Sequence, residues 1–146
     1  MSDRISKYID NFELLGAEQA GFRKGYSTTD HIFVFYSLIQ LYTKYKRRKL
    51  FCCFVDYQKA FDTVPRVLLW QKLLAHNVNG KILTVVKNMY ESAKSAVRLG
   101  HNIGKSFNCK IGVRQGDNLS PILFALYLND LQDFLSRAYN GSHFSI

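Results

Sequence analysis

One aspartate follows the most apolar stretch of the chain. Residues 50–55 are six apolar side chains in a row, and Asp56 comes directly after them. Such a run predicts a strand that is buried on both faces. A carboxylate at the end of such a strand can bind Mg²⁺, a hard cation that prefers oxygen ligands and often meets substrate phosphates in the same site. An isolated aspartate here is also a common turn or cap residue, so the spacing leaves both roles open.

Two loops could approach phosphate groups. The segment 112–116 is flanked by glycines and precedes a predicted helix start at Ser120 and Pro121. Its small residues expose backbone donors that suit a nucleotide or phosphate, although a plain strand-to-helix turn has the same spacing. The second loop holds Arg23 and Lys24 between two glycines. These cations could cover a triphosphate, although basic loop residues are more often only hydrated.

The elements that must position these residues alternate between helix and strand. Apolar residues three and four positions apart, together with start signals such as Ser27 and Pro65, predict helices over residues 27–49, 65–74, 82–90 and 120–137. Alternating residues predict an antiparallel hairpin with strands 95–99 and 107–111. The fold class is therefore α+β; that its antiparallel sheet, packed with helices, is incomplete is implied only by the family resemblance described below.

Two finer expectations concern the helix that starts near Pro65. Asp62 lies beside Thr63 and Pro65, a combination typical of a helix start. We therefore assign Asp62 to capping and leave it out of the catalytic set. The residues expected on the buried side of this helix are Val67, Leu68, Trp70, Leu73 and Leu74.

Composition bounds the class of protein. The 146 residues suffice for one domain with a sizeable core, and a net charge of +9 favours a polyanionic partner, with nucleic acid ahead of an anionic membrane surface. The three cysteines show no metal-binding spacing and are expected to be buried thiols. No signal segment or membrane span is predicted, which indicates a soluble protein of the cytoplasm or nucleus.

Three ordered segments resemble the reverse transcriptases of non-LTR, LINE-type retrotransposons. They read EQAGFRKGYST at residues 18–28, FVDYQKAFD at residues 54–62 and GVRQGDNLSP at residues 112–121. The resemblance extends from about Leu15 to about Leu135, and three segments in the right order are more specific than any single motif.

The resemblance implies a right-hand polymerase, with fingers over about residues 1–50 and palm, including a finger/palm insertion, over about residues 51–146. It implies an RNA template, a DNA primer and dNTP as partners. Asp56 would then be the catalytic ligand of Mg²⁺, in a site that holds two ions in the complete family. The nucleotide-binding residues that it implies are Arg23 at the phosphates, Lys59 and Ala60 at the triphosphate, Phe61 as the gate against a ribose 2′-hydroxyl, and Gln115 with Gly116 in the nucleotide and template pocket.

The sequence departs from the family pattern in two places. No Asp-Asp pair occurs in it, and Asn118 stands where the family usually has proline. Because Asp56 lacks those partner carboxylates, we expect a fragment of a polymerase, without the C-terminal palm and thumb, that is inactive alone. The alternatives are a non-catalytic basic module that binds nucleic acid, and a basic structural protein that does not.

Overall fold

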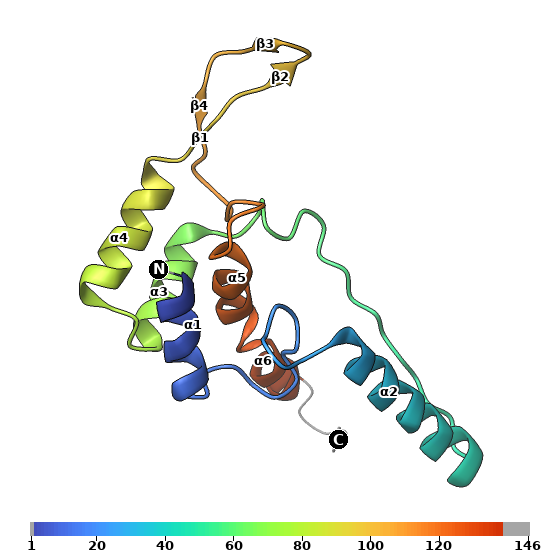
Figure 1. Cartoon of the computed structure of the whole chain (residues 1–146). Helices are drawn as coiled ribbons and strands as arrows, with labels where there is room; N and C mark the ends of the chain where they lie inside the picture. Colours follow the sequence, from blue (N-terminus) through green and yellow to red (C-terminus); the bar gives the residue numbers. More distant parts are fainter. Residues whose placement is uncertain (1, 139–146) are drawn as a thin grey trace. The chain divides into compact units, whose positions relative to one another are not determined.

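The computed structural model describes residues 2–138, which divide into two compact units (Figure 1). Unit 2 is Gly16–Gln58, and unit 1 consists of the described residues before and after it. Helices and short antiparallel strand pairs occur together, so the α+β fold class is confirmed. Within the described residues, no helix is both long and apolar enough to cross a lipid bilayer.

Unit 1 is a group of helices around one apolar core. Its helices are α1 (Ser2–Asn11), α3 (Arg66–Ala75), α4 (Gly80–Glu91), α5 (Ser120–Leu128) and α6 (Leu131–Ala138). Leu69 and Leu73 of α3 are fully buried, as are Leu123 and Leu126 of α5. Residues spaced three or four positions apart lie on one side of a helix, so each pair forms a stripe that faces the core.

The predicted helices over residues 65–74 and 82–90 are confirmed. The single helix predicted over residues 120–137 is divided into α5 and α6, and α1 lies where no helix was predicted. The buried side of α3 was predicted only in part. Val67, Leu68 and Leu74 are exposed, whereas the buried residues are Leu69 and Leu73. A run of apolar residues around a helix does not reveal which of two adjacent stripes faces inward. Packing against α5 and α4 decides it here, because both helices contact α3.

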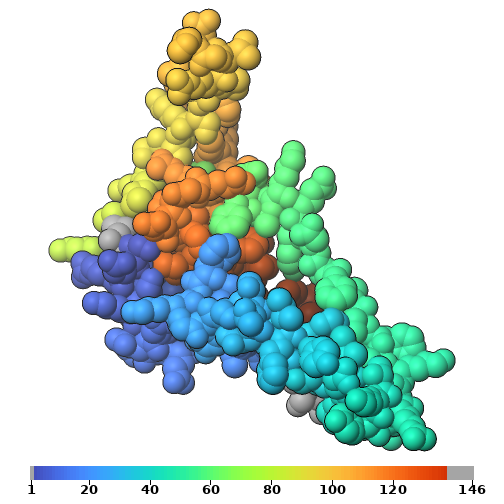
Figure 2. All heavy atoms as spheres, turned by 45° about the vertical axis from the view of Figure 1, so that its right-hand side comes forward, coloured from blue at the N-terminus to red at the C-terminus, as the bar shows by residue number. Residues whose placement is uncertain are grey.

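A two-stranded projection, which we call the arm (residues 93–110), extends from unit 1. At its base β1 (Lys94–Ser95) pairs with β4 (Phe107–Asn108), and nearer its tip β2 (Arg98–Leu99) pairs with β3 (Asn102–Ile103). Both pairs are antiparallel, so the predicted hairpin is confirmed with shorter strands. Figure 2 shows the gold-coloured tip of the arm standing clear of the helices of unit 1.

Unit 2 contains one long helical segment. The α-helix α2 (Thr28–Ile39) continues as the π-helix η1 (Gln40–Tyr45). The predicted start is confirmed, because the Ser27 hydroxyl accepts from the amides of Thr29 and Asp30, and the Asp30 carboxylate accepts from the Ser27 amide. This reciprocal capping box satisfies donors at the helix start.

The predicted buried strand over residues 50–55 is wrong. The segment has no regular structure, and Phe51, Phe54 and Val55 are 86%, 82% and 72% exposed. A strand forms only when its backbone groups pair with a neighbouring strand. Among residues 2–138 no segment pairs with it. The prediction of buried thiols is also wrong, since Cys52 and Cys53 are exposed and Cys109 is partly exposed.

Candidate nucleotide-binding site

Two motif segments that are far apart in the sequence lie against each other in unit 1. We call them the 59–64 turn and the 112–116 loop. The Gly112 amide donates to the Val64 carbonyl at 2.9 Å, and the Val113 amide donates to the Phe61 carbonyl at 2.7 Å. Val64 and Val113 are both buried in the core, so the two segments are held together by packing as well as by hydrogen bonds.

Gly112 makes the close approach of these segments possible. Its φ is +83°, and a Cβ built there would lie 2.6 Å from the Asp62 carbonyl oxygen. Only glycine combines a positive φ with a backbone contact this close at no steric cost. Gly112 is the first residue of the loop that was expected to approach phosphate. Its lack of a side chain allows the backbone of the 59–64 turn to pack against it.

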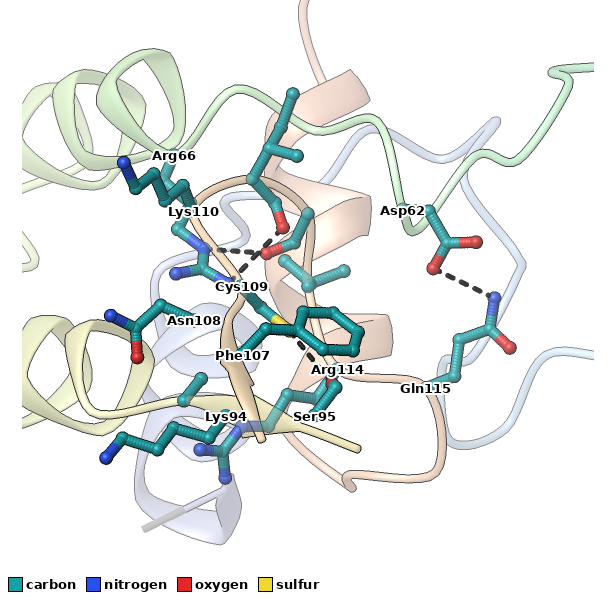
Figure 3. A pocket seen from close by; sticks show the side chains of 14 residues that line it. Asp62, Arg66, Lys94, Ser95, Phe107, Asn108, Cys109, Lys110, Arg114 and Gln115 are labelled. Carbon is teal, nitrogen blue, oxygen red and sulfur yellow. Dashed lines mark hydrogen bonds between the residues drawn. The ribbon is translucent and has the colours of Figure 1, made fainter. Parts of the chain in front are cut away.

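A side-chain hydrogen bond also joins the two segments. The Gln115 amide nitrogen donates to the Asp62 carboxylate at 3.3 Å, and both side chains are exposed (Figure 3). Asp62 is not the cap of α3: the N-cap residue is Pro65, which has no side-chain capping bond. The capping prediction for Asp62 is therefore wrong, because Asp62 serves the contact between segments instead. The sequence signal that could have indicated this contact was the position of Asp62 at the end of the motif segment 54–62.

The 59–64 turn presents three of the predicted residues. The Lys59 carbonyl accepts from the amides of Asp62 and Thr63, and Lys59 itself has a φ of +51°. A lysine in the left-handed region is uncommon, which indicates a turn fixed by its surroundings. Lys59 is exposed, and Ala60 and Phe61 are half-buried. The Phe61 ring stacks on Phe124 of α5, with the ring centroids 4.9 Å apart.

Two arginines attach the 112–116 loop to the end of α4. Arg66 donates to the carbonyls of Gly112, Tyr90 and Ile111, at 2.8, 2.7 and 3.3 Å. Arg114 donates to the Met89 carbonyl at 3.1 Å. Cations near the C-terminal carbonyls of a helix are favoured by its dipole. Sequence reasoning missed Arg66; its one signal was a cation in the first turn of α3, where the helix dipole opposes it.

The far end of the loop is anchored on α5. The Tyr90 hydroxyl and the Ser120 hydroxyl are buried and lie 2.9 Å apart. The Asp117 carboxylate accepts from the Leu119 amide at 3.1 Å, just before α5 begins. Between these anchors Gln115 and Gly116 are exposed, and Gly116 has a φ of +86°. The loop is therefore fixed at both ends and open in the middle.

A cavity of about 770 Å³ lies between the base of the arm, the 112–116 loop and the start of α3 (Figure 3). Among the described residues, four cationic side chains and one acid, Asp62, line it; the cations are Arg66, Lys94, Lys110 and Arg114. Burial lowers the pKa of Arg66, and the positive charge of Arg114 lowers it further, against opposing contributions from Cys109 and Tyr90. The lining is therefore strongly electropositive.

Arg23 belongs to unit 2, where it closes its own loop. One terminal nitrogen donates to the carbonyls of Gly16 and Gln19, at 2.8 and 3.3 Å. The guanidinium also lies 4.2 Å from the centroid of the Tyr26 ring. The structure thus gives Arg23 a structural task within unit 2.

Asp56 lies on the exposed, irregular segment at the end of unit 2. Among residues 2–138, no three side chains of histidine, cysteine, aspartate or glutamate gather closely enough to hold a metal ion. Two catalytic cations require several carboxylates. The described residues therefore do not by themselves fit a Mg²⁺ site.

Comparison with known proteins places the chain among retrotransposon polymerases. It is 30% identical to the probable RNA-directed DNA polymerase from transposon X-element of Drosophila melanogaster over 130 residues, which cover 88% of this chain and 14% of that protein. It is 26% identical over 137 residues to the corresponding protein from transposon BS of the same organism, covering 90% of this chain and 14% of the relative. It is 27% identical over 112 residues to the Pol polyprotein from the type-2 retrotransposable element R2DM, covering 75% and 11%.

The chain thus spans between 11% and 14% of the length of these relatives. The family described as Reverse transcriptase (RNA-dependent DNA polymerase) matches residues 1–145. These matches confirm the resemblance that the three motif segments carried. The chain belongs to the reverse transcriptase family.

Proposed function

We propose that this chain forms the fingers and the first part of the palm of a LINE-type RNA-directed DNA polymerase, with fingers over about residues 1–50 and palm over about residues 51–146. Its partners would be an RNA template, a DNA primer and dNTP. The 59–64 turn and the 112–116 loop would together bind the incoming nucleotide.

The observation that carries this proposal is the junction between those two segments. The motif segments are about fifty positions apart in the sequence, yet two backbone hydrogen bonds, a glycine contact and the Gln115–Asp62 bond join them. A site that positions a nucleotide needs its binding groups on a rigid support. The buried valines, and the bonds from Arg66 and Arg114 to carbonyls of α4, supply that support, while Gln115 and Gly116 stay exposed.

Phe61 would act as the gate against the ribose 2′-hydroxyl. The stack on Phe124 restricts its ring to one region, and its remaining exposed surface is what a sugar would meet. A bulky ring held in place leaves no volume for an added hydroxyl group. Discrimination would then depend on Phe124 as much as on Phe61 itself.

The triphosphate would meet the backbone of Lys59 and Ala60. The Lys59 carbonyl and the amides of Asp62 and Thr63 bond one another inside the turn, so the triphosphate would meet the amides of Lys59 and Ala60 and the lysine charge. Arg23 would reach the phosphates with the nitrogens that do not bond Gly16 and Gln19. Guanidinium groups suit phosphate oxygens because they present several donors in a fixed plane.

Asp56 would contribute one carboxylate to a Mg²⁺ site that the described residues do not complete. Magnesium, when bound, would lower the pKa of the primer hydroxyl and neutralise the phosphates. Because the sequence holds no Asp-Asp pair, this chain alone would not polymerise nucleotides.

Primer extension on a poly-rA template tests the assignment of residues. The assay would use a version of the chain that is extended to include the Asp-Asp hairpin of the family, with Mg²⁺ and dNTP supplied. Asp56→Asn should abolish extension, and Gln115→Ala should weaken dNTP use. Asp10→Asn is the matched control, because Asp10 is an exposed acid on α1 with no role in the proposal. Full activity of the Asp56 variant would remove the metal assignment.

A further inference from the structure

The chain contains a basic stretch, most of which lies outside the nucleotide site. Residues 92–116 include five lysines and arginines and no aspartate or glutamate. This stretch covers the whole arm and the whole 112–116 loop. Surface cations in globular proteins are usually interspersed with acids. A stretch this long without one indicates an anionic partner for the arm.

The strand register gathers part of this charge on one face of the arm. Lys94 lies directly opposite Asn108 in the β1–β4 pair. Directly opposed residues of an antiparallel pair share a face, and Lys110 follows Asn108 by two positions, which returns it to that face. Lys94 and Lys110 form no ion pair or side-chain hydrogen bond with any described residue. Two ammonium groups with an amide between them thus face the same side.

The opposite face of the same ribbon carries an aromatic ring. Ser95 and Phe107 are directly opposed, and Cys109 lies within 2.9 Å of the Ser95 hydroxyl. The Phe107 side chain lines the cavity and is 54% exposed. A volume of about 770 Å³ is within the range of sites that hold small organic ligands. The ring therefore has both an open face and room beside it.

The part of the chain that the structure describes does not neutralise the charges around the cavity. Asp62, its one acid, is engaged by Gln115, and this pair lies on the far side of the cavity from Lys94 and Lys110 in Figure 3. Arg66 and Arg114 use donors on backbone carbonyls, which carry no formal charge. A bound anion would relieve the repulsion among the four cations.

We propose that the base of the arm binds single-stranded nucleic acid that crosses the edge of the ribbon, with backbone phosphates on Lys94 and Lys110 on one face and one base against the ring of Phe107 on the other. All three side chains line the same cavity. Proteins that bind single strands combine cations that follow the backbone with aromatic rings that stack on bases. The inference rests on the proposed function only in its class of ligand. It needs no polymerase activity, and RNA and DNA share the groups that it uses.

The lysines are tested by the salt dependence of binding. Fluorescence anisotropy would measure the affinity of the 146-residue chain for a labelled oligo-rU and a labelled oligo-dT across a range of salt. Each phosphate contact contributes about 0.7 to the slope of log K against log salt for a single strand. The double variant Lys94→Ala/Lys110→Ala should therefore flatten the slope by about 1.4. Lys81→Ala/Lys87→Ala removes the same charge from α4, outside the cavity, and should leave the slope near that of the wild type.

The ring is tested by truncation and by fluorescence. Phe107→Ala should weaken binding at least about fivefold, as expected for loss of one stacked base. Leu99→Ala is the matched control, because Leu99 is an 81% exposed apolar residue at the tip of the arm. Phe107→Trp keeps an aromatic surface, so it should bind as the wild type does, and oligonucleotide should quench the added fluorescence. Far-ultraviolet circular dichroism checks that each variant folds.

Each outcome decides the proposal. Loss of affinity and slope in the cavity variants alone supports it, and tighter binding of oligo-rU or of oligo-dT then names the preferred strand. Equal losses in cavity and control variants would mean that only net charge matters, which overturns it. Unquenched F107W with normal affinity would remove the stacked base. Because no polymerase is assayed, failure here leaves the nucleotide site untouched, and failure of primer extension leaves the arm untouched.

Discussion

Gly112→Ala should be among the most damaging single-methyl changes in unit 1. The added Cβ would lie 2.6 Å from the Asp62 carbonyl oxygen and 2.9 Å from its carbonyl carbon and Cα. All three are backbone atoms, so no side chain can rotate away. The left-handed φ of +83° costs an alanine about 1–2 kcal/mol. Forcing the backbone apart adds about 1–3 kcal/mol, as for other overpacked sites.

Gly116→Ala is the matched control for this change. Gly116 has a φ of +86° in the same loop, but a Cβ there would meet nothing within 4 Å. The unfolding free energy of Gly116→Ala should therefore fall only by the cost of the left-handed conformation, about 1–2 kcal/mol. The difference between the two variants, about 1–3 kcal/mol, isolates the contact between the motif segments.

Urea unfolding followed by circular dichroism measures that difference. With a slope of about 1–3 kcal/mol per molar urea for a protein of this size, the unfolding midpoints should differ by about 1 M. Equal midpoints for the two variants would show that the backbones of Gly112 and Asp62 are not in contact. That result would also remove the observation on which the proposed nucleotide site depends.

Three further predictions concern single side chains. Tyr90→Phe strands the buried Ser120 hydroxyl and should cost about 1–3 kcal/mol of unfolding free energy in urea. Burial raises the pKa of Tyr90, so the wild type should lose stability as pH rises above the ordinary value of 10.0, and the variant should lack that loss. The hydrogen bond from Lys72 lowers the pKa of Asp130, so its stabilisation is present above the ordinary value of 3.8 and is lost as pH falls through the lowered one. Since the Asp130 side chain is 66% exposed, Asp130→Asn should cost below about 1 kcal/mol at pH 7 and nothing in strong acid. Arg23→Ala should flatten the salt dependence of oligonucleotide binding by about 0.7 if Arg23 contacts a phosphate, and an unchanged slope removes it from the site.

Three helix starts were predicted correctly because the signals that mark a helix start involve only neighbouring residues. The Ser27 cap, the Pro65 start and the Pro121 start are properties of a few neighbouring residues, and each marks the beginning of a helix within about a residue. The arm was predictable for the same reason, since alternation and a glycine turn are encoded within the hairpin. Its tip turns at Gly100, whose φ is +59°.

The lack of regular structure over residues 50–55 could not be predicted from the composition of that segment. Its apolar side chains satisfy the pattern of a buried strand, but a strand also needs partners for its amides and carbonyls. No described segment supplies them. The apolar pattern indicates that the segment favours a buried strand, but without a neighbouring strand among the described residues the segment stays irregular.

Motifs selected the residues of the candidate site, but they did not predict the contacts between those residues. Gln115 and Gly116 were selected by motif, whereas their link to Asp62 depends on a backbone approach that no local spacing encodes. Asp62 had a sufficient local explanation as a cap, which hid its contact with Gln115. The role of Arg66 could not be predicted, because its three carbonyl partners lie more than twenty positions away in the sequence.

The central claim is that this chain supplies the nucleotide-binding part of a polymerase but not its complete metal site. The most direct test is primer extension on poly-rA with Mg²⁺ and dNTP, comparing the 146-residue chain with a longer chain that carries the Asp-Asp hairpin after Ile146. We predict extension by the longer chain only. Extension by the 146-residue chain would contradict the account, because the described residues hold no cluster of acids for two ions. Inactivity of both would favour a non-catalytic nucleic-acid-binding module.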